Sequence, residues 1–262
     1  MDPLFDSVEK ARVFDLEQLR YAGAPSHPAH QPGFNYFLHR HHARGAAEAR
    51  TGASGIVVMP EHSGTHIDAL AHQAENLTLH GGISVEEGVQ TSAGFKKLGI
   101  ETMDPIVARG VLLDLARDRR LEEGHAITAE ELERAADVEI RQGDAVLIRT
   151  GYGALWSEPE AYLRAAGVSA AGSRWLVERK VKVAGADNMA FDVMGPTDPE
   201  LKVTLPGHVL LLVRAGIPII ENLNLEELAT AGVHEFLFVC LPLKMRGATG
   251  SPVRPIAIFT PR

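Results

Sequence analysis

The stretch His62-Ser-Gly-Thr-His66-Ile-Asp68-Ala-Leu-Ala-His72 places three imidazoles and one carboxylate within eleven residues. His66 and Asp68 are two residues apart, so on an extended strand their side chains leave the same face about 7 Å apart, with Ile67 turned toward the core. His62 lies an even number of residues from Asp68 and would face the same side of a straight strand, but about 13 Å from His66 along it. Gly64 tolerates the backbone angles of a bend that would bring His62 back toward Asp68. The stretch therefore predicts a metal site.

The residues after Asp68 extend this prediction. Ala69-Leu-Ala71 favours a helix with Asp68 at its N-terminal cap, which would bring His72 to the same face one turn later. Imidazole and carboxylate ligands suit zinc, manganese or iron, and a site without thiolate is not the usual structural zinc cage. Chance clustering of hydrogen-bonded histidines is the alternative, although dense His/Asp groups usually mark metal sites or catalysis.

The same segment, HSGTHIDALAH, resembles the H-x-G-T-H-x-D-x-x-x-H signature of the cyclase family of metal-dependent hydrolases, which includes bacterial kynurenine formamidase and isatin hydrolase. The resemblance continues through Asp15-Leu16, Gly185-Ala-Asp187, His208, Glu221-Asn-Leu and Gly250-Ser-Pro-Val-Arg254. It implies an α/β protein with the mixed β/β/α, swivelling-type fold, in which helices flank a curved, barrel-like sheet. We expect one domain over residues 1–262 with a proline-rich N-terminal loop region, assembled as a homodimer or homotetramer because relatives are usually homo-oligomers.

The resemblance also implies a ligand set. His62, His66 and Asp68 would hold a first ion, and Asp68, His208 and Glu221 would surround a second, giving one or two Zn²⁺ or Mn²⁺ per chain. The spacing from His208 to Glu221 is one residue longer than in kynurenine formamidases. His72 would be the catalytic proton shuttle.

These residues predict hydrolysis of an amide-type C–N bond in a small cyclic or N-acyl substrate. A zinc-type ion lowers the pKa of bound water from about 16 to about 7, which makes hydroxide available at neutral pH, and it polarises the carbonyl. Two alternatives stay open: a cyclase or lyase that uses the ion to stabilise an enolate, and a catalytically silent protein that binds a small molecule.

Composition and the lack of certain motifs argue against several other classes of protein. The chain has 262 residues, 45% of them hydrophobic, with a net charge of −8 and no dense basic run, which argues against nucleic acid and anionic membrane as partners. We expect a cytoplasmic protein, since no apolar run approaches the ~20 residues of a membrane span. Cys240 is the only cysteine and lies in an apolar run, so we expect a buried thiol. The chain lacks a phosphate loop, a dinucleotide fingerprint and a G-x-S-x-G elbow.

Hydrophobic patterning and capping signals predict the remaining elements. Buried strands are expected over 107–115, 144–149, 182–187 and 235–241, and helices over 158–166, 170–179 and from 223. Thr128-Ala-Glu-Glu131 is a capping box that would open a helix through about 136. Further along, a helix that begins at His208 and ends at Gly216 would precede a strand over 217–220 that delivers Glu221.

The N-terminal part is less regular. Prolines and glycines over 22–45 predict a long loop, and we interpret His39-Arg-His-His42 in it as solvated or substrate-facing. His27 stands where kynurenine formamidases carry an aromatic residue that packs on the substrate, which argues against a kynurenine-type substrate. The run Gly55–Met59 predicts a strand that leads into the metal stretch.

Three more residues are weaker candidates. We expect a supporting or surface role for His80 and a turn or supporting role for Asp187 rather than direct ligation. The turn over 247–252 should bring backbone close to the active site, with Arg254 near it.

Overall fold

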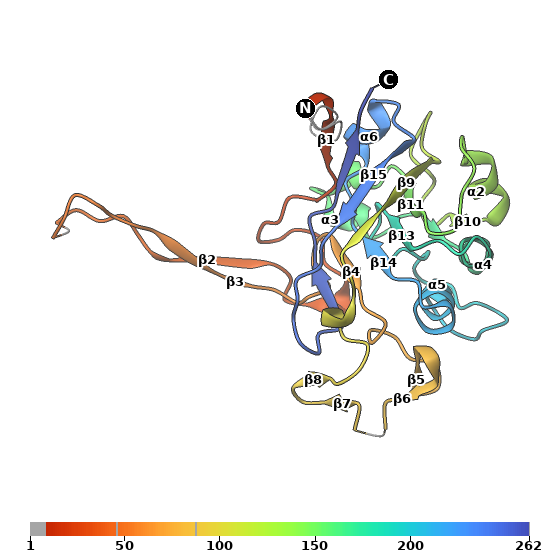
Figure 1. The fold of residues 1–262 in the computed structure, drawn as a ribbon, viewed down its shortest axis with the longest axis horizontal. Coiled ribbons are helices and arrows are strands. Elements are labelled where there is room, and N and C mark those ends of the chain that lie inside the picture. The colour runs from red at the N-terminus through yellow and green to blue at the C-terminus, as the bar shows by residue number, and fades with distance from the viewer. Residues whose placement is uncertain (1–8, 46, 87, 262) are drawn as a thin grey trace.

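The computed structural model describes residues 9–45, 47–86 and 88–261, and one large sheet organises them (Figure 1). Its nine strands curl into a half-barrel. In spatial order they are β1 (Arg12–Asp15), β17 (Ile256–Phe259), β15 (Glu235–Cys240), β9 (Ile106–Asp114), β11 (Ala145–Arg149), β13 (Val183–Ala186), β14 (Ile219–Glu221), β4 (His66–Asp68) and β16 (Gly250–Pro252). The central strands β9, β11, β13 and β14 run parallel, and the outer pairs are antiparallel.

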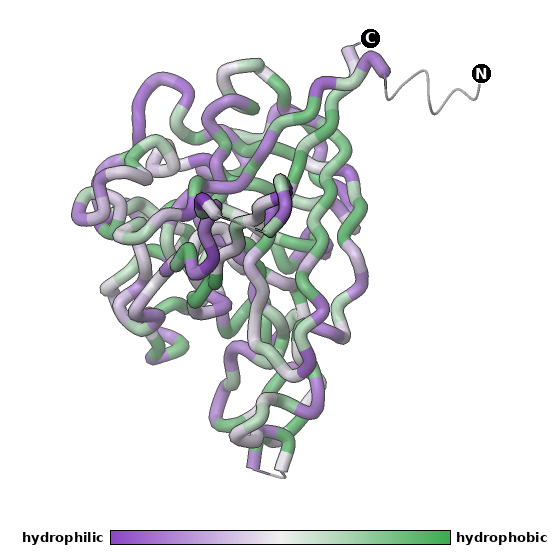
Figure 2. The backbone as a smooth tube through the Cα atoms, turned by 90° about the vertical axis from the view of Figure 1, so that its left-hand side faces the viewer, coloured by the Kyte–Doolittle hydropathy of each residue, from purple (hydrophilic) through white to green (hydrophobic). Residues whose placement is uncertain are grey.

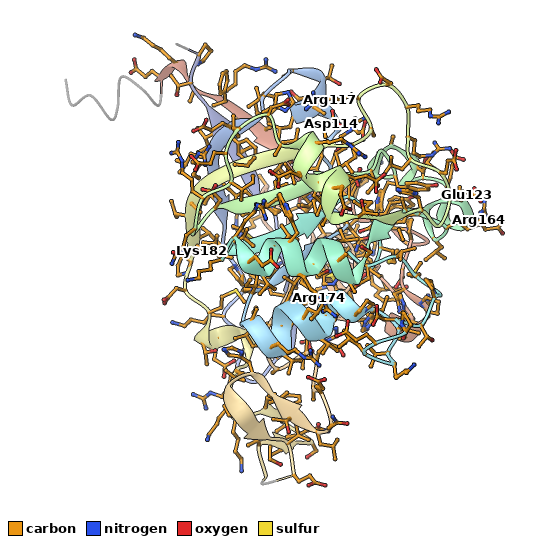
Figure 3. All side chains as sticks on the ribbon, turned by 90° about the vertical axis from the view of Figure 1, so that its right-hand side faces the viewer. Asp114, Arg117, Glu123, Arg164, Arg174 and Lys182 are labelled. Carbon is orange, nitrogen blue, oxygen red and sulfur yellow. The ribbon has the colours of Figure 1, made fainter. Side chains whose placement is uncertain are left out.

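Helices cover the outer face of the parallel strands. They are α2 (Ala129–Ala135), α4 (Ala170–Glu178), α5 (Pro206–His208) and its π-helical continuation η5 (Val209–Ala215). Elsewhere lie α3 (Pro159–Tyr162), α6 (Glu226–Thr230) and the short turns η1 (Pro28–His30), η2 (His80–Gly82), η3 (Ile100–Thr102) and η4 (Gly153–Leu155). Figure 3 faces the helix-covered side, where charged residues such as Arg117, Glu123, Arg164 and Lys182 lie at the surface.

Strand side chains alternate between two hydrophobic cores. On β9, Val111 and Leu113 pack with the helices, whereas Leu112 points inside the curl with Phe238 of β15. Hydrophobic residues accordingly follow the strands of the body in Figure 2. Because both faces are buried, the parallel strands read as continuous apolar runs in the sequence. The prediction of an α/β fold with a curved sheet is confirmed.

Most predicted elements lie where the patterning placed them. Thr128 and Glu131 form the capping box at the start of α2. His208 lies in α5, the helix ends at Gly216 with a φ of +70°, and β14 delivers Glu221. The helix expected over 158–166 is shorter, since α3 covers only Pro159–Tyr162.

Two local predictions are wrong. Residues 69–72 make a single turn rather than a helix: the N–H of His72 donates to the carbonyl of Ala69, and the N–H groups of Ala69 and Ala71 donate to Thr249 and Leu98 across the chain. Part of the expected loop is β2 (Asn35–Arg40), which pairs with β3 (Ser54–Val58). The strand expected over 55–59 therefore belongs to this hairpin, and the ligands lie on β4 instead.

The β2–β3 hairpin, residues 35–45 and 47–58, stands away from the body as an arm (Figure 1). His39, His41 and His42 are exposed on it, in agreement with the solvated interpretation. Besides the arm, the described residues form three two-stranded sheets. They pair β5 (Thr78–Leu79) with β6 (Ile83–Ser84), β7 (Gln90–Thr91) with β8 (Gly94–Phe95), and β10 (Ala126–Ile127) with β12 (Gly167–Val168). Among the described residues, no helix has the length and apolarity needed to cross a membrane.

Candidate metal centre

The predicted ligands meet where β4 lies between β14 and β16. The antiparallel register sets Glu221 opposite His66, and Gly250 opposite Asp68. His66 and Asp68 leave one face of β4, while Ile67 between them is buried in the inner core, as their spacing predicted. His66 and Glu221, which are 155 positions apart in the sequence, thus share one site.

A bend at Gly64 returns His62 to this face. The φ of Gly64 is +63°, a left-handed conformation that favours glycine, and a Cβ there would lie 2.5 Å from Nη1 of Arg20. The Arg20 guanidinium donates to the carbonyl oxygens of Ser63 and Thr65 on either side of the bend. Nδ1 of His62 consequently lies 2.8 Å from Oδ1 of Asp68.

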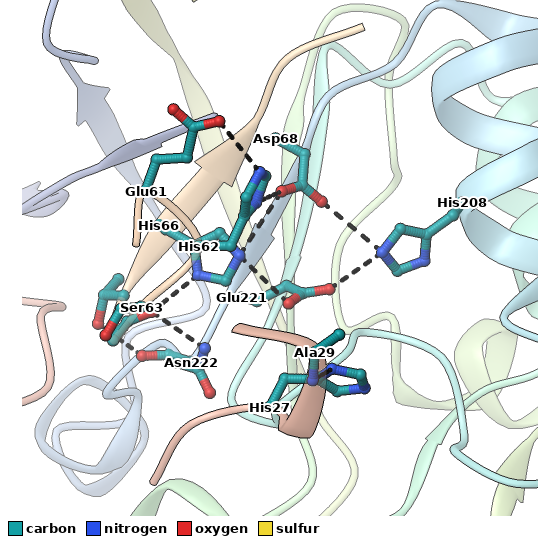
Figure 4. A network of polar contacts seen from close by, with 12 residues as sticks. His27, Ala29, Glu61, His62, Ser63, His66, Asp68, His208, Glu221 and Asn222 are labelled. Atoms are coloured by element: carbon teal, nitrogen blue, oxygen red, sulfur yellow. Dashed lines mark hydrogen bonds and ion pairs between the residues drawn. The ribbon is translucent and has the colours of Figure 1, made fainter. Parts of the chain in front are cut away.

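The remaining ligand candidates approach the same carboxylates (Figure 4). Nε2 of His66 lies 3.5 Å from Oδ1 of Asp68 and 3.4 Å from Oε2 of Glu221. Nε2 of His208 lies 3.3 Å from Oε1 of Glu221 and 3.7 Å from Oδ2 of Asp68. All five side chains are buried. Asp68 therefore lies between two groups of donors.

In each of the three proposed ligand histidines, His62, His66 and His208, the ring nitrogen that points away from the carboxylates, called the outer nitrogen here, is hydrogen-bonded to an oxygen atom. Nδ1 of His66 lies 2.8 Å from the carbonyl of Gly64, and Nδ1 of His208 lies 2.8 Å from Oδ2 of Asp192. The inner Nε2 atoms of both rings face the carboxylates. Burial lowers the pKa of His66 to about 3, so its ring is neutral and the inner nitrogen carries a lone pair.

The ring of His62 is oriented by a hydrogen-bond chain through Thr249 to Glu61. Oε1 of Glu61 accepts the hydroxyl hydrogen of Thr249, and Nε2 of His62 lies 2.8 Å from that hydroxyl oxygen. Because the hydroxyl hydrogen goes to Glu61, Nε2–H of His62 is the donor in this pair. Nδ1 is then the nitrogen that faces Asp68. Outer hydrogen bonds of this kind orient metal-binding imidazoles.

The donor set fits a divalent cation. Oδ2 of Asp68 and Oε1 of Glu221 are buried without a hydrogen-bond partner, although buried carboxylate oxygens normally have one. Nitrogen lone pairs and carboxylate oxygens that face each other repel unless a proton or cation lies between them. Ligand atoms of His62, His66 and Asp68 lie within 4.8 Å of one another, as do those of Asp68, His72 and His208. The residues present therefore suit a metal ion.

His72 differs from the other histidines of the stretch. Its ring stacks on that of His62, with centroids 3.9 Å apart, and burial lowers its pKa to about 3. Among the described residues, none makes a hydrogen bond to its ring. It also lies close enough to Asp68 and His208 to share an ion with them. The shuttle role of His72 stays a prediction.

Three residues at this site escaped sequence reasoning. The ring of His30 stacks on His62 at 4.9 Å and belongs to a further possible ligand group with His62 and His72. Asp192 orients His208, and Thr249 orients His62. No periodicity marks these positions, because His30 lies in the three-residue turn η1 and the other two act across long sequence separations. The glycines around Thr249 were the only signal.

The weaker candidates lie elsewhere or act indirectly. His27 caps η1 through Nδ1, and its ring lies 5.6 Å from that of His30. Nδ1 of His80 lies 2.9 Å from the carbonyl of Val213 on η5, which is a supporting contact. The carboxylate of Asp187 accepts hydrogen bonds from the turn after β11, as expected for a turn role. Arg254 follows β16, and its exposed side chain pairs with Asp15 rather than with a ligand candidate.

Cys240 is buried on β15, and burial raises the pKa of its thiol to about 12. The expectation of a buried thiol is confirmed, and such a thiol is inert as a nucleophile at neutral pH.

Known proteins resemble this chain over most of its length. Cyclase-like protein 3 of Oryza sativa subsp. japonica is 30% identical over 210 residues, which cover 76% of this chain and 63% of that protein. Cyclase-like protein 1 of Arabidopsis thaliana is 31% identical over 203 residues, covering 75% and 66%. The chain thus spans slightly less than two thirds of these plant proteins. Isatin hydrolase of Roseibium aggregatum is 25% identical over 215 residues, covering 77% and 73%.

Solved structures show the same fold. The crystal structure of a novel cyclase superposes with a TM-score of 0.84 at 28% identity, covering 98% of this chain and 91% of that one. Isatin hydrolase A from Ralstonia solanacearum superposes with a TM-score of 0.76 at 24% identity, covering 97% and 95%. The Cyclase family model matches residues 14–193, which include the whole His62–His72 stretch. By sequence and by fold, the chain belongs to the cyclase family.

Proposed function

We propose that the chain is a metal-dependent hydrolase that cleaves an amide-type C–N bond of a small cyclic or N-acyl substrate. One observation carries the proposal: two buried carboxylates with unpartnered oxygens face imidazole nitrogens whose opposite nitrogens are already hydrogen-bonded. This arrangement is what a metal site of oxygen and nitrogen ligands needs. Relatives described as isatin hydrolase and as metal-dependent hydrolase support the reaction class.

We assign His62, His66 and Asp68 to a first ion and Asp68, His208 and Glu221 to a second, with zinc or manganese as the metal. When bound, such an ion lowers the pKa of water to about 7 and polarises a carbonyl. Asp68 supplies one carboxylate oxygen to each group of donors. His66 and His208 need no rearrangement of their outer hydrogen bonds to present Nε2 inward.

The protein's own acid–base group in this scheme is His72. Its ring stacks on that of the proposed ligand His62, with centroids 3.9 Å apart, and an imidazole in that position is able to accept a proton from water. The oxygen of water forms the new bond to the carbonyl carbon, and the C–N bond breaks. His72 then returns the proton to the leaving nitrogen. Contact with His62 keeps the ring in place beside the ligands.

The substrate class follows from the relatives and from the imidazoles of His27 and His30 beside the site. Isatin hydrolase, by its name, acts on a cyclic amide, and we extend that class to this chain. The resemblance sets His27 where kynurenine formamidases carry an aromatic residue; its ring lies 5.6 Å from that of His30, which stacks on His62. These imidazoles are hydrogen-bonding groups, and they favour a substrate with polar substituents.

A substrate panel tests the proposal. Metal-loaded protein is incubated with formanilides, isatin, cyclic imides and lactones in ¹⁸O-labelled water, and the products are analysed by mass spectrometry. Hydrolysis of an amide should place one label in the new carboxylate, and Asp68→Ala should abolish it. Turnover without label incorporation would instead favour a lyase or cyclase, and binding without turnover a silent protein.

A further inference from the structure

The helix that carries His208 is π-helical over most of its length, since α5 passes directly into η5. At its end, the N–H of Gly216 donates to the carbonyl of Leu211, five residues back. The N–H of Ile217 donates to the same oxygen at 2.8 Å. π-Helical turns are rare and occur mostly at functional sites. The usual form of such a segment is an α-helix, so contacts from outside the helix must favour the wider turn.

One such contact comes from His80. The segment 73–84, which follows His72, contains β5, η2 and β6 and lies below α5 in the view of Figure 1. Nδ1–H of His80 donates to the carbonyl of Val213 at 2.9 Å. This carbonyl is one of the last four of the helix, which lack acceptor bonds from within the helix. His80 therefore supplies a donor that the helix itself does not provide.

Two more contacts join the segment 73–84 to the end of η5. The guanidinium of Arg214 donates through Nε and Nη2 to both carboxylate oxygens of Glu75, at 2.9 and 2.6 Å. The ring of His80 also lies against Gly216, where a Cβ would be 2.6 Å from Cε1 and Nε2. Because the Glu75–Arg214 pair is partly exposed, we expect it to contribute less than the contacts of His80.

We propose that His80 is a positioning residue for His208. The start of the helix is fixed by Asp192, which accepts the backbone N–H groups of Gly207 and His208. Its end is fixed by His80 through the carbonyl of Val213. Between these two points, the π-helical form sets how far the ring of His208 is turned relative to the end of the helix.

A change of helical form would displace the ring of His208. An α-helical turn holds fewer residues than a π-helical turn, so a shift to the α form rotates the start of the helix relative to its end. Only two residues separate Gly216 from β14, which is bonded into the sheet, so the end has little room to follow. The rotation would therefore turn Nε2 of His208 away from Asp68 and Glu221, which it faces at 3.7 and 3.3 Å.

The segment 73–84 starts directly after His72, whose ring centroid lies 6.0 Å from that of His208. It thus connects the proposed proton shuttle with the helix of the second ion. The inference rests on the proposed function, because the second ion belongs to that proposal. It adds a residue that touches neither substrate nor ion and acts through the helix.

Calorimetric titration of the metal-free protein with Mn²⁺ tests the inference. His80→Phe keeps a ring against Gly216 but removes the donor to Val213. It should weaken the second ion by about 10-fold, the lower end of the range for partners that orient metal-binding side chains, and leave the first ion unchanged. His80→Asn should restore most of the affinity, because its amide supplies an N–H donor.

His234→Phe is the matched control and should bind both ions as the wild type does. His234 is likewise a partly exposed histidine, and it lies beside Asp137 directly before β15, away from β14 in the sheet order. Hydrogen exchange gives a second measurement that needs no metal. In metal-free His80→Phe, peptides over 209–217 should exchange faster than in the wild type, whereas peptides over 62–72 should not change.

Three results would overturn the inference. They are equal losses at both ions in His80→Phe, no loss at either ion, and unchanged exchange over 209–217. Equal losses would show that His80 only stabilises the fold. A wild type that binds one ion would also overturn the inference and leave the hydrolase proposal standing. A wild type that binds no metal would overturn both, so the wild-type titration separates the two failures.

Discussion

The carboxylate of Asp192 accepts a hydrogen bond from Nδ1 of His208 at 2.8 Å, and it also accepts the backbone N–H groups of Gly207 and His208. One acidic side chain thus fixes both the start of α5 and the ring that it carries. Since Nδ1 is engaged, Nε2 of His208 points at Asp68 and Glu221. Asp192 is a positioning residue for the proposed second ion.

Asp192→Asn should weaken binding of the second ion by about 10–100-fold, the usual cost of losing the hydrogen-bond partner of a metal-binding imidazole. Calorimetric titration of metal-free protein with Mn²⁺ measures both sites separately. Asp118→Asn, a change at an exposed position, is the control. Equal loss at both sites would instead point to damage of the whole fold around α5.

Chelation should abolish activity, and zinc or manganese should restore it, because the unpartnered oxygens of Asp68 and Glu221 need a cation. Metal analysis of purified protein by mass spectrometry gives the stoichiometry. One ion per chain would remove His208 and Glu221 from the assignment while the first site remains. Active protein without metal would contradict the mechanism.

Asp68→Ala should lose metal as well as turnover, because Asp68 faces His62 and His66 through Oδ1 and His208 through Oδ2. Metal content and turnover are measured on the same preparation, with circular dichroism to verify folding. A variant that keeps full metal occupancy would refute the bridging role.

His72→Ala should lower kcat by about 10²–10⁴-fold, the range of general acid–base catalysis, while metal content stays at the wild-type level. His72 lacks the outer hydrogen bond that orients the three proposed ligands, which is the reason to separate it from them. His62→Ala and His66→Ala should instead deplete the metal. If His72→Ala also loses the ion, His72 is a ligand and His30, whose ring lies 6.1 Å from it, is the next shuttle candidate.

Asp187→Asn should reduce the free energy of unfolding by about 2–3 kcal/mol, because the amide would direct N–H groups at donors that now have a carboxylate acceptor. Oδ1 of Asp187 accepts from N and Oγ1 of Thr150, and Oδ2 accepts from N of Gly151 and of Gly153. Urea denaturation measures the change. Metal affinity should remain unaffected, and a selective loss of metal with unchanged stability would show a role at the site instead.

The sequence by itself determined the local geometry of the metal centre. The two-residue spacing of His66 and Asp68 sets them on one face of a strand, and Gly64 supplies the bend for His62. Helix, glycine and strand after His208 follow from hydrophobic patterning and from the preference of Gly216 for positive φ. These features depend on residues that are neighbours in the sequence, so the backbone preferences and periodicity of a short segment are enough to predict them.

Only the tertiary structure decided which distant residues complete the site. Sheet order places β14 beside β4 and β16 on the other side, and this brings Glu221 and Thr249 to the histidines. The stretch 69–72, predicted as a helix, forms a turn whose backbone is hydrogen-bonded to Thr249 and Leu98 across the chain. Asp192 and His30 act through contacts that no local pattern encodes. The physical reason is that burial and hydrogen bonding between distant segments outweigh local propensity, and those contacts exist only once the sheet has formed.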